Sequence, residues 1–320
     1  MTAQERTRLL AEKQFLTARI DSIPAAAGLT RASLQSRLKT IEGGLQVSLN
    51  RAHRDPARAR LTFGGRPVVR SHGVFADFGT KAAGRFVDAI AAVAASITAP
   101  LAAMGPIPGR DQNQLLIIGT AIGSFGFELE EHQADAAVFP EPTSAGIALE
   151  RTQKLLAGSI DADDEVLADA AAELDPRALD KVRDFVSLLA DNEAFCGLSV
   201  GDHVFQFSDS GQVRRSLARL GSDNLKKREV VLAGEFLGVL PTRRTFEFLS
   251  GGQVLVGKIG PGVERPEIIN AHLKEPVQLS LMETQVGSGR PRYVIIKQPA
   301  DWDSPDSVLA NRPVPPFRHG

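Results

Sequence analysis

The chain has 320 residues, of which 43% are hydrophobic and 23% charged. These proportions are those of a globular protein, so they exclude disorder along the whole chain. Its single cysteine excludes a disulfide scaffold and a cysteine-rich metal site, and it fits a reducing cytoplasm. The length predicts two compact domains with an accessory element.

Residues 1–55 are expected to form an antiparallel helical hairpin, with Pro24 and Gly28 where the chain reverses. Each helix has only a narrow apolar stripe, which is too little to be stable in water without a partner. The hairpin would bury both stripes, and dimerisation would bury more; plain packing within one hairpin is the alternative. The stripe of the second helix is the candidate assembly seam and consists of Leu34, Leu38, Ile41, Leu45 and Leu49.

Residues 56–225 predict a mixed α+β central domain that begins with two hairpins. Two β-like segments flank Gly64-Gly65, a pair that is typical of a hairpin turn. A continuous apolar run at 115–118 and an alternating run at 125–130 predict a second hairpin beside the first.

Helices are expected between and after these strands. One spans about Asp77 to Ile97, with Asp77 as its N-cap. Its alanine-rich extension to residue 104 is nearly long enough to span a bilayer, but Pro100 interrupts it, so a buried helix and no membrane partner are expected. From residue 143 onward helices dominate, and Asp175-Pro176 marks a helix start.

Residues 226–300 predict a small β-barrel of the SH3-like or OB-like kind, because five short β-like runs alternate with turn residues. The alternation along these runs favours Phe246 and Phe248 in the barrel core. Residues 301–320 are proline-rich and predict an extended tail. The expected fold class is therefore α+β, with a helical hairpin, a central domain and a barrel.

Three blocks of the chain, RPVVRSHGVFADFGTKA, LLIIGTAIGSFGFELEE and GEFLGVLPTRRTFEF, resemble segments of uncharacterised bacterial proteins that share a GSFGFELEE-like block and a barrel-like C-terminal segment. The three blocks together comprise 49 of the 320 residues. It implies a bacterial, cytoplasmic protein and carries no activity with it.

The acidic strand 127–131 offers the one candidate for catalysis. Strand alternation places Glu128 and Glu130 on one face, about 7 Å apart, where paired carboxylates would hold a metal ion or divide acid and base roles. Each role needs further ligands, and the nearby candidates are His72, Asp77, Asp111 and His132. A half-exposed strand with acidic outward positions explains the same residues. No cofactor is expected.

Arginines gather in two segments that would suit a phosphate backbone, because guanidinium groups bind phosphate in a bidentate manner. The alternative is that they are solvated or pair with the protein's own acidic residues. The candidate nucleic-acid contacts are Arg51, Arg54, Arg58 and Arg60 in the connector, and Arg243, Arg244 and Arg292 in the barrel.

Three functions remain open from the sequence. The first is a non-catalytic assembly protein that forms a homo-oligomer or joins a larger complex through the hairpin. The second is a nucleic-acid-binding protein that uses the arginines, and the third is a metal-dependent enzyme at Glu128 and Glu130. The net charge of −1 does not choose among them, because it is unevenly distributed. Residues 1–60 have 11 basic and 5 acidic groups, residues 111–225 have 8 and 21, and residues 226–300 have 11 and 7.

Overall fold

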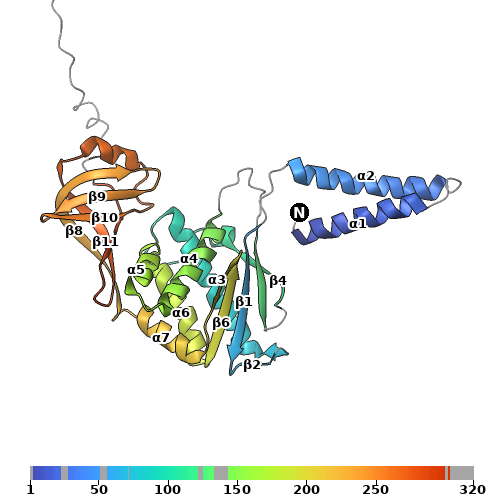
Figure 1. The fold of residues 1–320 in the computed structure, drawn as a ribbon, viewed down its shortest axis with the longest axis horizontal. Coiled ribbons are helices and arrows are strands. Elements are labelled where there is room, and N and C mark those ends of the chain that lie inside the picture. Colours follow the sequence, from blue (N-terminus) through green and yellow to red (C-terminus); the bar gives the residue numbers. More distant parts are fainter. Residues whose placement is uncertain are drawn as a thin grey trace, which may run out of the picture.

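The computed structural model describes residues 3–22, 28–50, 56–70, 72–121, 125–132, 143–299 and Trp302. Within these residues the chain has a mixed α+β fold with a closed five-stranded barrel in its C-terminal region (Figure 1). Arg51, Arg54 and nearly all of the expected tail lie outside the described residues.

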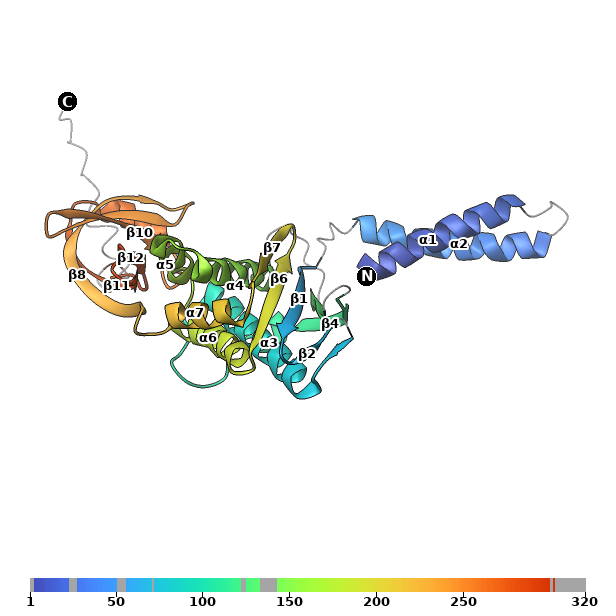
Figure 2. The same ribbon diagram turned by 60° about the horizontal axis from the view of Figure 1, so that its bottom comes forward.

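Two helices, α1 (Ala3–Ser22) and α2 (Gly28–Asn50), form the N-terminal region. Leu16 and Ile41 are buried between them, and Leu9, Leu34 and Leu38 pack against that pair. Figure 2 shows the two helices side by side, projecting from the rest of the chain. The contact between the two helices is narrow.

The central domain contains a five-stranded antiparallel sheet in the order β4-β5-β1-β6-β7. Alternate residues of β1, including Leu61 and Phe63, are buried toward the helices, so Arg58 and Arg60 lie on the opposite face. The strands are β1 (Arg58–Gly65), β4 (Leu115–Thr120), β5 (Gly126–Glu131), β6 (Ala194–Val200) and β7 (His203–Gln206).

Helices pack on one face of this sheet and form the main core with it (Figure 1). Phe86 of α3 meets Phe185 of α6 at 5.4 Å between ring centroids, in the middle of that layer. The helices are α3 (Ala76–Thr98), α4 (Ser144–Ile160), α5 (Asp164–Ala172), α6 (Pro176–Asp191) and α7 (Ser210–Leu220), and a short 3₁₀ turn, η1 (Arg110–Asn113), precedes β4.

Side-chain caps start four of these helices, α4 to α7. Asp163 accepts a hydrogen bond from the backbone N–H of Glu165 at α5, and Asp175 accepts one from Arg177 at α6, with Pro176 in the first turn. The N-cap expected at Asp77 was wrong. Phe75 occupies the N-cap position of α3 without a side-chain bond, and Asp77 lies in the first turn, where it binds Lys81.

The hairpin expected at Gly64-Gly65 was also wrong, because both glycines lie within β1. They pair with Phe195 and Ala194 of β6, while the next strand, β2 (Val68–Val69), pairs with β3 (Gly73–Val74). A Cβ on Gly64 would lie 2.3 Å from the Phe195 ring, so the glycine accommodates that ring instead of forming a turn. By contrast, the expected pairing of residues 115–118 with 125–130 is confirmed as β4 and β5.

The barrel closes in the order β10-β12-β11-β8-β9. The pair β10–β12 is parallel, and the other neighbours are antiparallel. Its strands are β8 (Leu225–Leu240), β9 (Thr245–Ser250), β10 (Gln253–Ile259), β11 (Pro276–Val286) and β12 (Arg292–Ile295), and the 3₁₀ segment η2 (Pro266–His272) lies between β10 and β11.

The barrel has its own core. Phe236, Phe246 and Phe248 are at most 1% exposed, so the expectation that Phe246 and Phe248 form the core is confirmed. Trp302 joins this core and stacks on His272 with 4.5 Å between ring centroids. No helix among the described residues is long and apolar enough to cross a membrane.

Candidate functional site

The two candidate catalytic carboxylates lie on the sheet face that points away from the helices, each opposite an arginine of β1. Arg58 is the cross-strand partner of Glu130, with 2.6 Å between Arg58 Nη2 and Glu130 Oε2. Arg60 is the cross-strand partner of Glu128, with 3.4 Å between Arg60 Nη2 and Glu128 Oε1. The structure thus brings together two acidic and two basic candidates that the sequence placed in different sites.

The two pairs differ in their exposure to water. Only 3% of the Glu130 side chain is exposed, whereas 43% of Glu128 is. Arg58 donates to Glu130 through both Nε and Nη2, so the buried carboxylate is held by two hydrogen bonds. This arrangement is that of a structural ion pair, in which the guanidinium group already occupies the carboxylate.

The neighbouring Glu131, which sequence reasoning passed over, faces the helices and is 7% exposed. Its Oε2 accepts hydrogen bonds from the Ala57 backbone N–H at 3.3 Å and from the Thr143 hydroxyl at 2.9 Å. Because Thr143 is the N-cap of α4, Glu131 fastens the start of that helix to the sheet. Because Glu131 directly follows Glu130, strand alternation places the two side chains on opposite faces of the sheet.

The two candidate histidines do not join the carboxylates through any contact of the described residues. His132 is exposed and follows β5, with its backbone N–H donating to Gln114. His72 is exposed between β2 and β3, which follow the Gly65 end of β1, whereas Arg58 is at the other end of that strand. Over the part of the chain that the structure describes, no group of three or more His, Cys, Asp or Glu residues is placed to hold a metal ion.

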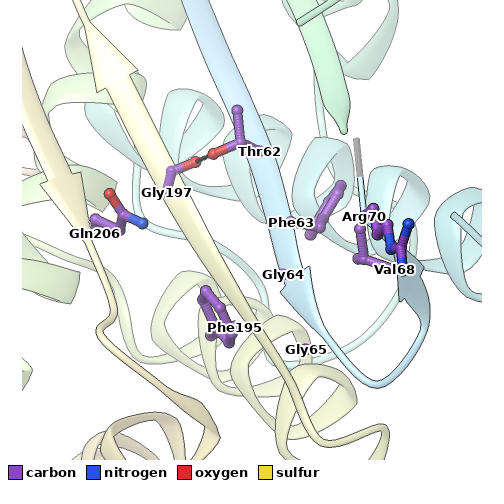
Figure 3. Close-up of a pocket in the computed structure, with 9 residues that line it drawn as sticks. All are labelled: Thr62, Phe63, Gly64, Gly65, Val68, Arg70, Phe195, Gly197 and Gln206. Atoms are coloured by element: carbon purple, nitrogen blue, oxygen red, sulfur yellow. Dashed lines mark hydrogen bonds between the residues drawn. The ribbon is translucent and has the colours of Figure 1, made fainter. Parts of the chain in front are cut away.

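A pocket of about 360 Å³ opens on the same sheet face, toward the other end of β1 (Figure 3). Gly64 and Gly197 give it a shallow floor between the strands, and the Phe195 ring and Gln206 side chain border it. The Thr62 hydroxyl donates to the Gly197 carbonyl at 3.5 Å. Arg70, at a φ of 51°, is the charged group of its lining.

The barrel arginines are engaged to different degrees. Arg244 donates to three backbone carbonyls, those of Ile259, Gly260 and Val263, and so secures the turn between β8 and β9. Arg292 binds Asp169 and Glu165 of α5. Arg243 is exposed and makes no hydrogen bond or ion pair within the described residues.

Cationic side chains of the barrel fasten it to the acidic central domain. Lys258 binds Glu173, and Arg292 binds Glu165 and Asp169 of α5. Lys227 donates to the carbonyls of Ala171, at 2.7 Å, and of Leu174 at the end of α5. Burial lowers the pKa of Lys227 to about 8, although Asp175 attracts its proton. Basic side chains of the barrel therefore form ion pairs with acidic side chains of residues 165–173.

The assembly seam is described only in part. Leu34 and Leu38 are half-buried and Ile41 is 4% exposed, all against α1. The side chains of Leu45 and Leu49 lie outside the described ones. Phe15 of α1, which sequence reasoning missed, is 68% exposed. Its apolar neighbours on the helix, Ala11 and Ala18 at positions i−4 and i+3, would have revealed it.

The single cysteine is a buried thiol. Cys196 is 0% exposed in β6, and burial raises the pKa of its thiol well above the ordinary value. Because the thiolate is the reactive form, this residue is poorly placed to act as a nucleophile.

The chain shows no significant similarity to any protein-family model, curated protein or solved structure. The functional argument therefore depends on the geometry of its own residues.

Proposed function

We propose that this protein works by association, forming a homo-oligomer through α1 and α2. The observation that carries the proposal is the exposed Phe15 on a helix pair with a very small core. Two helices of this length bury too little apolar surface to be stable by themselves. The pair's hydrogen bonds and ion pairs stay within it across the described residues, including Arg37 with Glu12 and Lys13 with Glu42.

A second copy is the occupant that fits this surface best. Two such helix pairs would form a four-helix bundle, in which Phe15, Ala11 and Ala18 of each copy lie inside. The small alanines on both sides of the ring would let the helices approach closely. Apart from Leu10, which is 45% exposed, the other exposed side chains described on the two helices are polar or small, as expected for the outside of a bundle.

The barrel supports association over nucleic-acid binding. We propose that it is of the OB kind, because it joins its third and fifth strands in parallel and places η2 between its third and fourth. Single-strand binders of this kind stack bases on exposed aromatic side chains. Here the phenylalanines are inside, and the outer face of β10 carries the exposed apolar side chains of Val254 and Val256, which suit a protein contact.

Light scattering coupled to size exclusion tests the proposal on the full chain. We expect a dimer or larger multiple for the wild type and a monomer for Phe15→Glu, because a buried charge would replace the central ring. Gln14→Glu adds the same charge at an exposed neighbouring position and should keep the wild-type mass. A monomeric wild type, or a Phe15→Glu protein of unchanged mass, would contradict the proposal.

The ion pairs of the arginines also favour association over nucleic-acid binding. Arg58, Arg60 and Arg292 all bind carboxylates of residues 111–225, so their charge is balanced within the fold. We also propose that the protein is bacterial and cytoplasmic. Titration with a fluorescent single-stranded DNA at low salt provides the opposing test, because a nucleic-acid-binding protein would bind it and lose affinity steeply as salt is added.

A further inference from the structure

A cavity of about 1120 Å³ lies where the barrel meets the central domain. One wall is made by the end of α3, the segment after it and the junction of α5 with α6. The other is made by the outer face of β10, β12 and β11 together with the turn between β8 and β9. Ligand sites are frequently found between domains, and this volume accommodates a small organic molecule.

The barrel wall presents an apolar strip that belongs to neither hydrophobic core. Met282 of β11 is the cross-strand partner of Val294 of β12, and Val294 is the partner of Lys258 of β10. Ile296 lies two positions after Val294, just beyond the end of β12. All four line the cavity, while the cores contain other residues of these strands. Apolar side chains are therefore directed into the cavity instead of into a packed interior.

The apolar segment after α3 faces this strip from the opposite wall. Pro100 and Leu101 line the cavity there, and the backbone N–H of Leu101 donates to the Asp175 carboxylate at 3.1 Å. The carboxylate that caps α6 thus also holds this segment in place. The cavity consequently has apolar surface on two sides.

The charges around the cavity favour an anion. Its lining includes six cationic and four acidic side chains. Glu173 is shared by Lys258 and Arg151, so this group of three retains a positive charge. Arg243, which has no ion-pair partner within the described residues, lies two positions before Thr245, the cross-strand partner of Lys258. Arg177, Lys227 and Arg244 of the lining donate to backbone carbonyls. The cation of the lining without an ion pair or such a contact among the described residues, Arg243, therefore lies at the β10 end of the apolar strip.

We propose that this cavity binds an amphipathic anion, with its carboxylate or phosphate beside Arg243 and Lys258 and its apolar chain along Val294 and Met282. The strip crosses two strand spacings, about 10 Å, which matches an extended chain of about eight carbon atoms. Guanidinium and ammonium groups would bind the head group through charge-assisted hydrogen bonds. The apolar chain would cover side chains that the fold leaves unpacked.

Calorimetric titration of the full chain with decanoate, decyl phosphate and decanol tests this site. We expect saturable binding of at least one of the two anions, and affinity about tenfold lower for decanol, which has no charge for the cations to bind. The stronger of the two anions identifies the head group. Absence of saturable binding by both anions, or equal affinity for decanol, would overturn the proposal.

Matched variants locate the site. Arg243→Gln should weaken anion binding about tenfold, because it removes a charge-assisted contact, whereas Arg290→Gln, at an exposed position outside the cavity, should not. Val294→Trp should abolish binding by filling the strip, whereas Val231→Trp, at a 59% exposed position of β8 away from the cavity, should leave it unchanged. Binding that survives both Arg243→Gln and Val294→Trp would show that the anion lies elsewhere. Circular dichroism confirms that each variant is folded.

Discussion

Arg58 Nη2 lies 2.6 Å from Glu130 Oε2 across strands β1 and β5, and the carboxylate side chain is only 3% exposed. A second pair, Arg60 with Glu128, stands beside it with both side chains 43% exposed. The two Arg–Glu pairs therefore lie next to each other on one face of the sheet, one with a buried carboxylate and one with an exposed carboxylate. This contrast gives a direct measure of what burial contributes.

We expect Arg58→Gln to lower the free energy of unfolding by about 2 kcal/mol, because it leaves the buried Glu130 carboxylate without its charged partner. Arg60→Gln should cost less than about 1 kcal/mol, since water solvates Glu128. Urea unfolding followed by circular dichroism measures both. Equal losses in the two variants would mean that Glu130 is stabilised by groups other than Arg58.

Gly126 allows β5 to approach β1 closely, and its replacement should be costly. A Cβ at this position would lie 2.1 Å from the Leu61 carbonyl oxygen, which is backbone and cannot rotate away. We expect Gly126→Ala to lower the free energy of unfolding by about 2 kcal/mol. Gly73→Ala is the control, because a Cβ there meets nothing within 4 Å, and its melting temperature should match that of the wild type.

Lys227 should make stability depend on pH in a window above neutrality. Burial lowers its pKa from 10.5 to about 8, so between these values the unfolded chain holds a proton that the folded chain has released. The contribution of Lys227 to the free energy of unfolding therefore rises with pH across this window. We expect the stability of the wild type relative to Lys227→Met to increase from pH 8 to pH 10, as measured by urea unfolding.

A difference that stays constant over this range would contradict the expectation. Lys226→Met serves as the matched control, because Lys226 is exposed. Its stability difference from the wild type should not vary with pH between 8 and 10.

Trp302 should contribute to the barrel although it lies beyond the last strand. Its ring packs 5.7 Å from Phe236 and 4.5 Å from His272, between ring centroids, and it is 7% exposed. We expect Trp302→Ala to lower the free energy of unfolding of the barrel by about 3 kcal/mol. Val256→Ala, at a 64% exposed position of the same barrel, should change it by less than about 0.5 kcal/mol. Thermal unfolding followed by circular dichroism distinguishes them, and equal effects would exclude a role for Trp302 in the core.

Local signals in the sequence were reliable where each depends on a few neighbouring residues. The acid before Pro176 starts α6, and alternation along residues 245–250 places Phe246 and Phe248 inside the barrel. The same reasoning failed at Gly64-Gly65, because Gly64 is required by the ring of Phe195, 131 positions away, and Gly65 by the backbone carbonyl of Glu193. A glycine pair that forms a turn and one that accommodates a ring look alike in sequence.

The candidate sites show the same limit. Strand alternation correctly placed Glu128 and Glu130 on one face, but the partners that neutralise them, Arg60 and Arg58, lie about 70 positions earlier. The cavity beside Arg243 was not predicted at all, because its walls come from the helices on one side and the barrel on the other, which are far apart in the sequence.

By itself, the sequence determined the helices, most of the strands, the barrel and the uneven distribution of charge, since periodicity, capping and composition are local properties. Only the tertiary structure decided which acidic and basic side chains pair with one another. Carboxylates of residues 111–225 bind Arg58 and Arg60 on one side and Lys258 and Arg292 on the other. The reason is physical: an ion pair requires side chains within about 4 Å, and strand pairing and domain docking alone bring such distant residues that close.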